Sequence, residues 1–177
     1  MENNNLGLEN ESLIIEEKFM DGSVYQGQIL FGKKHGKGIF RYANGGAYDG
    51  DWFENKMHGY GVLYYEDKNV AYEGRWFNDH FHGKGVLYNE KKSIEYERPD
   101  FDWSDFSQLE NFWLKFEGNF TMDNKEGKGT LFLSNGDIFY GKFVKDNVEG
   151  EGKYVIKGGA IITGLWKDNK YIDFMEG

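Results

Sequence analysis

The sequence contains no cysteine and a single proline, Pro99, in 177 residues. Without cysteine the chain can form no disulfide scaffold, thiolate zinc site or iron–sulfur cluster, and it has no cysteine nucleophile. Basic residues are also scarce, 21 against 30 acidic ones, and the net charge of −9 offers no field for holding a nucleic-acid backbone. The longest charge-free apolar run, about residues 158–166, is far shorter than the ~20 residues of a membrane helix. The first residues are acidic and asparagine-rich, unlike a secretory signal peptide, so we expect a soluble, cytoplasmic chain.

Glycine and aromatic residues, in contrast, are abundant. The chain has 25 glycines and 18% aromatic residues, whereas an ordinary globular domain has about 7% glycine. Disordered glycine-rich tracts lack aromatic residues. The combination therefore predicts an ordered chain with many tight turns and close backbone contacts.

These residues recur with a period of 23. A glycine follows an aromatic-x pair, as in Tyr48-Asp49-Gly50, and this glycine recurs at steps of 23, 24, 44, 23 and 23 residues. A second glycine lies in a His/Glu-Gly-x-Gly motif, and a third marker, an Asp-Gly, Asn-Gly or Gly-Gly pair, keeps the same phase. We assign a structural role to the glycines of the first two markers: Gly27, Gly36, Gly50, Gly59, Gly74, Gly83, Gly118, Gly127, Gly141, Gly150 and Gly164.

Each repeat predicts a β-hairpin. The Asn-Gly, Asp-Gly and Gly-Gly pairs supply the positive φ of type I′ turns, and the next segment alternates with period two, so Tyr48, Gly50 and Trp52 share one face. Glycine between two large rings leaves a notch for a side chain of the neighbouring strand. With a starting strand at residues 13–19, the sequence predicts about 12 strands, or roughly 55 Å of sheet. The expected fold is all-β: an elongated, single-layer antiparallel β-meander of stacked hairpins with one insertion.

The 44-residue step places this insertion at residues 90–115, which include seven acidic and four basic residues. We divide the chain into an N-terminal tail (1–12), a first block of repeats (13–89), the insertion, and a second block with a C-terminal cap (116–177). Residues 104–113 are expected to form a short helix capped by Ser104. Either the insertion pads one edge of the sheet, or it docks a partner through its exposed aromatic residues. Those residues are Phe101, Trp103, Phe106, Phe112 and Trp113.

In these motifs the sequence resembles the MORN (membrane occupation and recognition nexus) repeat family, whose pattern is Tyr-x-Gly-x-Trp followed by His-Gly-x-Gly. The units at Tyr48 and Tyr72 match best, whereas later units have Phe for Tyr and Trp, and Glu for His. The resemblance covers roughly residues 21–171 apart from the insertion. It implies antiparallel hairpins stacked into an extended, grooved sheet. It also implies mostly architectural roles: ciliary and cytoskeletal scaffolds, membrane-contact proteins, and accessory modules of lipid kinases or methyltransferases.

Catalytic and metal sites have little support in the sequence. His35, His58 and His82 recur in register, but successive hairpins advance by about 10 Å, too far for ligands that each lie ~2.1 Å from one metal. Glu126 and Glu149 fill the same position, which favours a hydrogen-bonding role beside a turn. The Gly-Lys-Gly segments lack the Ser/Thr and the following helix of a phosphate-binding loop. We therefore expect neither catalysis nor a cofactor or metal.

The remaining interpretations of the sequence concern binding partners, either lipid or protein. Anionic lipid would require clustered basic residues, and the candidates Lys33, Lys34, Lys37, Lys91 and Lys92 are few in an acidic chain. A single-layer sheet cannot cover both of its faces, so an aromatic stripe favours a partner helix, a second such sheet, or the insertion folded across it. Its residues are Tyr25, Tyr48, Trp52, Tyr72, Trp76, Phe116, Phe139 and Trp166. The sequence thus predicts a non-enzymatic scaffold subunit of a cytoskeletal assembly, with the ciliary axoneme favoured by the resemblance alone. The alternatives are a phosphoinositide-associated tethering or kinase-accessory module and a homo-oligomeric filament former.

Overall fold

The computed structural model describes residues 13–90, 101–109 and 112–172. The chain divides into two compact units, Met1–His80 and Phe81–Gly177, and each is described by itself. The predicted tail, residues 1–12, lies outside the described residues, as does part of the insertion.

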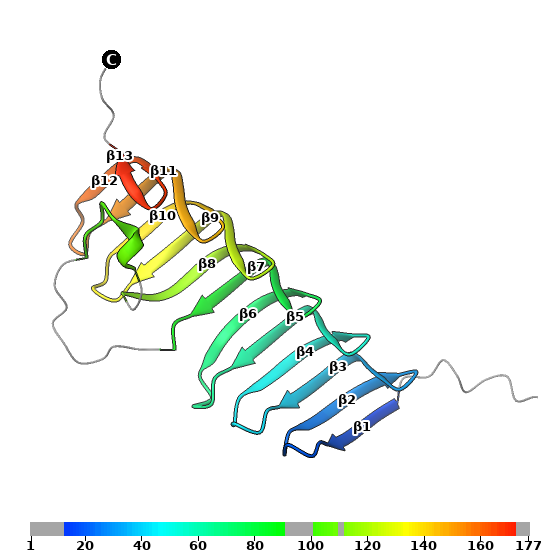
Figure 1. Ribbon diagram of the computed structural model, residues 1–177. Helices are drawn as coiled ribbons and strands as arrows, with labels where there is room; N and C mark the ends of the chain where they lie inside the picture. Colours follow the sequence, from blue (N-terminus) through cyan, green and yellow to red (C-terminus); the bar gives the residue numbers. More distant parts are fainter. Residues whose placement is uncertain (1–12, 91–100, 110–111, 173–177) are drawn as a thin grey trace, which may run out of the picture. The chain divides into compact units, whose positions relative to one another are not determined.

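The first unit is an antiparallel meander in which each strand pairs with the next in sequence (Figure 1). Its strands are β1 (Leu13–Lys18), β2 (Val24–Leu30), β3 (Lys33–Arg41), β4 (Ala47–Phe53), β5 (Lys56–Tyr64) and β6 (Val70–Phe77).

The second unit repeats this topology and adds one turn of 3-10 helix. Its elements are β7 (His80–Tyr88), η1 (Phe106–Gln108), β8 (Trp113–Thr121), β9 (Asn124–Leu133), β10 (Ile138–Val144), β11 (Asn147–Val155), β12 (Ile161–Lys167) and β13 (Lys170–Ile172). Strand order follows sequence order from β1 to β13, and no described residue is in an α-helix. The predicted all-β antiparallel meander is confirmed, and the strand beyond the expected 12 is β13.

The core of each repeat is an aromatic ring that lies on a pair of glycines. Gly50 and Gly61 face each other across β4 and β5, and the ring of Tyr48 covers both. A Cβ atom added to Gly50 would lie 2.5 Å from the Cα of Gly61 and 2.7 Å from Cζ of Tyr48. The predicted notch therefore exists, but at Gly50 a ring two residues earlier in the same strand fills it, whereas at Gly164 the ring of Tyr171 from the neighbouring strand does so, as predicted. A one-layer sheet acquires a core in this way because ring and backbone bury each other.

The glycines of the second motif have a different role. They have positive φ values between 62° and 79°, and each is the fourth residue of its return strand. Gly59 lies at a shift in register, where residues 59 and 60 are extra between the pairs Gly50–Gly61 and Asp51–His58. Extra residues of this kind form a β-bulge, and glycine is the least strained choice for its left-handed position. These glycines are Gly36, Gly59, Gly83, Gly127 and Gly150.

The type I′ turns lie at the opposite hairpin ends from the Asn-Gly and Asp-Gly pairs at which the sequence predicted them. At Asn44-Gly45 only Gly45 has positive φ, and the Asn44 side chain accepts a hydrogen bond from Gly46 N–H (3.2 Å). Such a turn is one residue longer than type I′, and the type I′ prediction was wrong here. Both central residues have the positive φ of type I′ at the opposite hairpin ends. These turns lie at residues 31–32, 54–55, 78–79, 122–123, 145–146 and 168–169.

Candidate functional site

The tyrosines of the repeat motif in the first unit, Tyr25, Tyr48 and Tyr72, are interior residues. The Tyr48 ring meets the rings of Trp52 and Trp76 edge-on, at centroid distances of 5.2 and 5.1 Å. Its hydroxyl donates to the carbonyl oxygen of Asp51 (2.9 Å), and Tyr25 and Tyr72 make the equivalent bond. Burial raises the pKa of Tyr25 to about 12, because the charged phenolate would lose its hydration.

All eight side chains predicted to bind a partner are at most 6% exposed: Tyr25, Tyr48, Trp52, Tyr72, Trp76, Phe116, Phe139 and Trp166. The structure brings them together as one aromatic layer within each unit, and their polar atoms are used inside the chain, as in the bond from Trp52 Nε1–H to Gly38 O (3.0 Å). Their part in partner binding stays a prediction. In the structure these side chains pack against the residues beside them on the same face of the sheet. We call this face the aromatic face.

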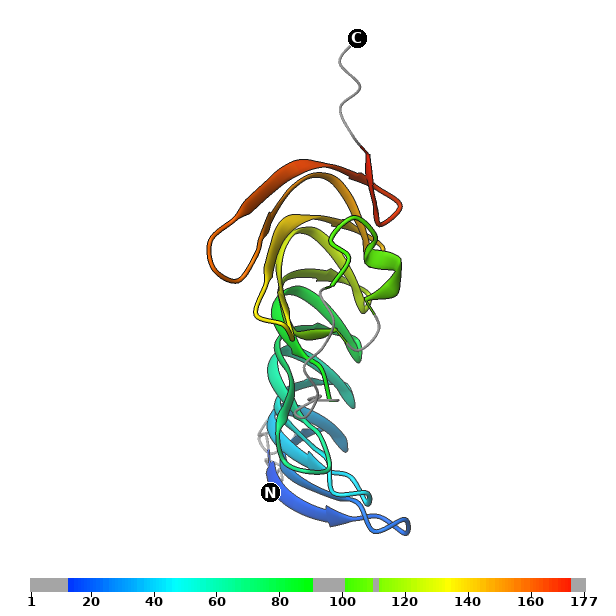
Figure 2. The same ribbon diagram turned by 90° about the vertical axis from the view of Figure 1, so that its left-hand side faces the viewer.

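In the second unit the insertion covers this aromatic face (Figures 1 and 2). Phe106 in η1 lies 4.6 Å from the ring of Phe139 and 6.3 Å from those of Tyr154 and Trp166. Phe101 stacks at 6.5 Å on Tyr154 and contacts Phe106 at 5.3 Å. Both phenylalanines are buried. Of the two readings that the sequence left open, the described insertion residues pack on their own chain.

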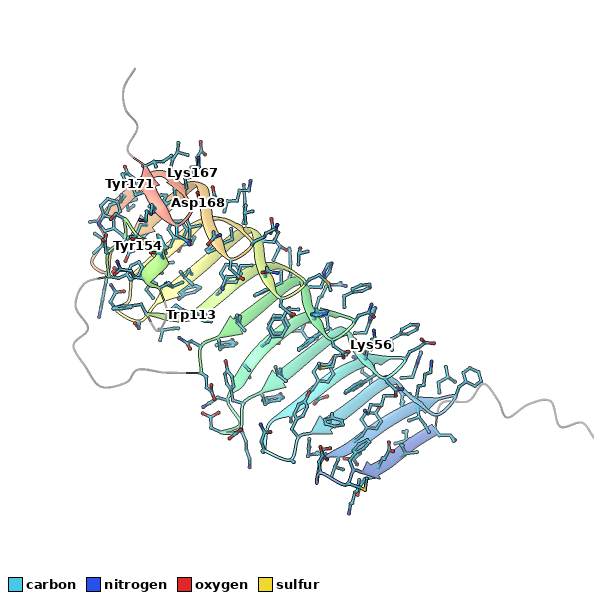
Figure 3. The ribbon with its side chains drawn as sticks, viewed as in Figure 1. Lys56, Trp113, Tyr154, Lys167, Asp168 and Tyr171 are labelled. Carbon is cyan, nitrogen blue, oxygen red and sulfur yellow. The ribbon has the colours of Figure 1, made fainter. Side chains whose placement is uncertain are left out.

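The main chain of the insertion also runs along the last strand, β13. Tyr171 N–H donates to Ser104 O (2.7 Å), and Phe106 N–H donates to Asn169 O (2.8 Å). Trp166 Nε1–H donates to Trp103 O (3.1 Å), and the Trp103 ring contacts that of Tyr171 at 5.1 Å. Figure 3 labels Tyr171 on β13 and Tyr154 on β11, two of the side chains that this segment covers.

The helix predicted at residues 104–113 is much shorter in the structure. Its described part is a single 3-10 turn, and Asp105, not Ser104, caps it by accepting from Ser107 N–H (2.9 Å). The backbone of Ser104 is instead engaged with β13, which leaves it unable to begin a helix. Phe112 packs on Phe101 at 5.5 Å, and Trp113 is the first residue of β8.

The first unit leaves the equivalent surface open. On the second strands of the hairpins, Leu131 and Tyr154 in the second unit are 0% exposed. Their counterparts in the first unit, Phe40 and Leu63, are only partly buried, and the neighbouring Tyr42 is 36% exposed. No described segment covers Phe40, Tyr42 and Leu63, which we call the open aromatic surface. Sequence reasoning missed these residues because it followed the motif in the first strand of each repeat.

The three lysines proposed for lipid binding are engaged within the first unit. Lys33 pairs with Glu54 (3.5 Å), and Lys37 pairs with Asp51 (2.6 Å). The Lys34 ammonium lies over four rings, at 4.7 Å from Phe40 and 5.2 to 5.5 Å from the others: Phe19, Tyr25 and Trp52. Burial lowers the pKa of Lys34, while the acidic residues Glu17 and Asp79 raise it. Lys91 and Lys92 lie outside the described residues.

The recurring histidines of the first unit contact phenylalanine rings at tilted angles. Phe53 lies between His35 and His58, with centroid distances of 5.2 and 5.7 Å. At the same repeat position in the second unit, Glu126 accepts from Lys145 N–H (3.1 Å) and Glu149 from Asp168 N–H (2.8 Å), the turn-side role that the sequence indicated. Among the described residues no three side chains of the metal-binding types gather at one point.

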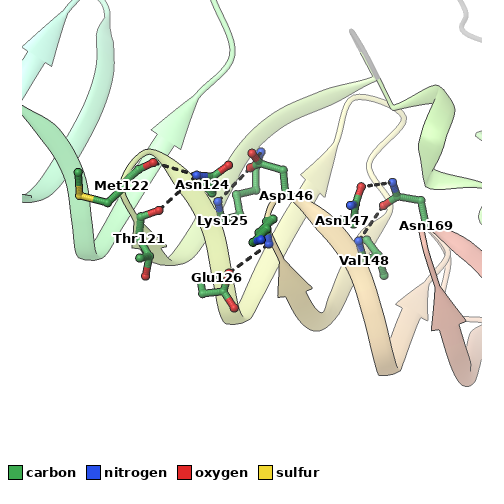
Figure 4. Close-up of polar contacts among 10 residues, drawn as sticks. Thr121, Met122, Asn124, Lys125, Glu126, Asp146, Asn147, Val148 and Asn169 are labelled. Atoms are coloured by element: carbon green, nitrogen blue, oxygen red, sulfur yellow. Dashed lines mark hydrogen bonds and ion pairs between the residues drawn. The ribbon is translucent and has the colours of Figure 1, made fainter.

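A ladder of Asn and Asp side chains joins successive repeats (Figure 4). In five of the six type I′ turns, all but the one at residues 31–32, the side chain of the second residue accepts a hydrogen bond from a main-chain N–H of the preceding repeat, and its own N–H donates to the carbonyl oxygen of that residue. Asp146, for example, accepts from Lys125 N–H (2.9 Å), and Asp146 N–H donates to Lys125 O (3.1 Å). The same pair of bonds is made by Asn55 with Lys34, Asp79 with Met57, Asp123 with Phe81, and Asn169 with Val148.

The opposite face of the second unit carries a shallow groove of about 970 Å³. Its floor is formed by glycines of β9 to β12, and its walls carry both signs of charge. Lys128 and Lys142 face each other directly across β9 and β10, with Glu117 and Glu151 nearby in the lining. In the described part of the chain, no helix has the length and apolar character to cross a membrane.

Comparison with known proteins agrees with this geometry. The family profile of the MORN repeat matches residues 25–47, 48–70, 72–91 and 116–138, which together make up half of the chain. Each matched segment contains an aromatic first strand and its glycine. A search of curated proteins found no match.

Proposed function

The chain belongs to the MORN repeat family, and from that premise we propose that it is a non-enzymatic scaffold that binds other proteins through the aromatic face of its first unit. MORN repeats form a non-catalytic module for interaction or membrane association. The proposal narrows this to protein binding, in a cytoskeletal assembly. The ciliary axoneme, in a complex of the radial-spoke or central-apparatus type, is the favoured location, and its support is the family's occurrence in ciliary scaffolds.

The proposal rests on one observation: in the second unit a segment of the same chain, the insertion, lies on the aromatic face. The insertion fills it with two buried phenylalanines and three main-chain or indole hydrogen bonds. The first unit repeats the same strands and rings but has no described segment over Phe40, Tyr42 and Leu63. A partner segment with similar chemistry, aromatic side chains at short spacing and a few acidic residues, would fit there. In the second unit Asp105 forms a main-chain bridge with Lys170. Hydrogen bonds from Ser107 lower the pKa of the Asp105 carboxyl, and the charge of Lys170 lowers it further. Lys33 and Lys56 begin the corresponding strands of the first unit.

The experiment compares two tyrosines on opposite faces. Tyr42, 36% exposed, belongs to the open aromatic surface, whereas Tyr140, 42% exposed, lies in the groove of the opposite face. The tagged full-length chain is purified from its native cell, and bound proteins are quantified by mass spectrometry. We expect Tyr42→Ala combined with Leu63→Ala to reduce recovery of specific cytoskeletal proteins at least tenfold, and Tyr140→Ala to leave it unchanged. Equal recovery with both variants would contradict the proposed surface.

A phosphoinositide-associated tether is the second candidate, because the family includes membrane-associated modules. The ion pairs of Lys33 and Lys37 and the aromatic contacts of Lys34 weigh against it, since these ammonium groups would have to leave their present partners. Flotation with phosphoinositide-containing vesicles separates the two functions. Binding that is lost when Lys33, Lys34 and Lys37 are replaced by alanine would overturn the scaffold proposal in favour of the tether.

A further inference from the structure

The first and last strands differ in what lies at their outer edges. β13 has three residues, and the insertion runs along it through the bond from Tyr171 N–H to Ser104 O and a bridge between Asp105 and Lys170. β1 has six residues, and within the described part of the chain β2 is the only strand that pairs with it. Proteins usually cover or blunt such edges, because unpaired N–H and C=O groups attract another strand. Among the described residues the chain does so at β13, and no described segment covers the outer edge of β1.

The open edge of β1 has the groups that strand addition needs. The bond from Phe19 N–H to Ser23 O (2.9 Å) sets the alternation of the β1–β2 ladder. Ile15 and Glu17 therefore turn their main-chain groups toward β2, and Ile14 and Glu16 turn theirs to the open edge. The Ile14 side chain is 79% exposed and that of Leu13 is 60% exposed. Large apolar side chains beside free main-chain groups form a surface suited to another strand.

We infer that β1 pairs with β1 of a second copy of this chain, antiparallel, around a two-fold axis that passes between the two Ile15 residues. In this register Ile15 faces Ile15, Ile14 faces Glu16, and Leu13 faces Glu17. Ile14 and Glu16 both direct their main-chain groups outward, so they form the hydrogen-bonded pairs. A shift of one residue toward Lys18 would place Glu16 opposite Glu16, and like charges in directly opposed positions destabilise a strand pair. A shift toward Leu13 would place Ile14 opposite Ile14 and shorten the pairing within β1 to residues 13–15.

The occupant is a second copy because β1 is complementary to itself. In the inferred register the outward main-chain groups of Ile14 meet those of Glu16 in the other copy, the two Ile15 side chains meet at the axis, and Glu16 keeps its ion pair with Lys18 of its own strand (3.6 Å). Head-to-tail addition of β1 to β13 is blocked by Ser104 and Asp105, so pairing ends at two copies in place of an open filament. This contact does not involve the open aromatic surface, so it stands apart from the proposed function.

Light scattering of the full-length chain tests the dimer. We expect twice the 20.6 kDa of one chain. Glu16→Pro removes an outward N–H that β2 does not use, and proline is tolerated at that position of an edge strand. We expect this variant to be monomeric with an unchanged melting temperature. Glu16→Thr, which keeps the N–H, should remain dimeric. A monomeric wild-type chain, or a Glu16→Pro variant that melts unchanged and still dimerises, would overturn the inference.

The register is tested with single cysteines, because the chain has none of its own. Opposed residues in a non-hydrogen-bonded pair lie about 4.5 Å apart at Cα, within the range that a disulfide spans. Ile15→Cys should therefore form a disulfide-linked dimer under mild oxidation. Ile14→Cys, opposite Glu16 and not opposite itself, should crosslink at least tenfold more slowly. If Ile14→Cys crosslinks as fast as Ile15→Cys, or if neither crosslinks, the inferred pairing is wrong.

Discussion

Replacing Gly61 with alanine should destabilise the first unit through the ring of Tyr48. The added Cβ would lie 2.5 Å from Cζ and Cε2 of a ring that is fully buried. The ring must move, and its hydroxyl then loses the carbonyl oxygens of Asp51 (2.9 Å) and His58 (3.4 Å). Overpacking of this kind costs about 1–3 kcal/mol, and the lost hydrogen bond about 1 kcal/mol. Alanine recovers about 0.4–1 kcal/mol by restricting the unfolded chain. We therefore expect the free energy of unfolding to fall by roughly 2 kcal/mol.

A double-mutant cycle isolates this mechanism. Urea unfolding is followed by tryptophan fluorescence for Gly61→Ala, Tyr48→Leu and the double variant, and hydrogen exchange in β4 and β5 locates the effect. Leucine places no ring over Gly61, so Gly61→Ala should cost under about 1 kcal/mol in the Tyr48→Leu background, and the cycle should give a coupling above about 1 kcal/mol. Equal costs in the two backgrounds would refute the reasoning, because the loss would then be independent of the ring.

Three further predictions follow from the contacts described above. The raised pKa of Tyr25, from 10.0 to about 12, means that its contribution to stability is complete below pH 10 and is lost as pH rises toward 12; circular dichroism against pH should show this loss together with the part of the tyrosinate absorbance that Tyr25→Phe removes, and if that part appears at pH 10 without unfolding, the reasoning is wrong. Asp146→Ala should cost about 0.5–1.5 kcal/mol in urea unfolding by removing the side-chain acceptor of the exposed Lys125 N–H, whereas Asp146→Asn, which retains an acceptor oxygen, should cost less; an equal or larger loss for Asn would show that charge, not the ladder bond, matters. Phe106→Ala should cost about 3–5 kcal/mol and increase hydrogen exchange in β11, while Gln108→Ala in the same turn should stay within about 0.5 kcal/mol.

The strands were predictable from the sequence because their signals are local and repeated. An aromatic residue, a glycine and a second aromatic residue recur at one spacing, so an error in one unit is corrected by the others. The turns were not predicted correctly, because Asn-Gly is typical of type I′ while the neighbouring Glu54-Asn55 looks merely polar. The sequence did contain a signal for the ladder: Asn or Asp recurs at positions 55, 79, 123, 146 and 169. Those residue types tolerate positive φ and can accept a hydrogen bond.

The surface of the candidate site was less predictable for a physical reason. Trp103 and Trp166 are 63 positions apart, and no periodic pattern connects the insertion to the strands it covers. Whether Phe40 or Leu63 is accessible depends on that distant segment, and not on the motif of their own repeat. Sequence reasoning therefore found the aromatic layer but could not separate its buried rings from the neighbouring residues that remain open.

The Asn/Asp ladder has a consequence for how such chains can grow. Its bonds join residues 21 or 22 positions apart, except that the bond from Phe81 to Asp123 spans 42. The additional residues lie in the sequence between β7 and β8, and the ladder bond there is 2.8 Å long, within 0.1 Å of the others. The hairpin ends that carry the ladder thus fix the spacing between repeats, whereas the opposite hairpin ends can accept inserted residues. For protein engineering, the turns near residues 44, 67, 135 and 158 are the places to graft foreign binding loops.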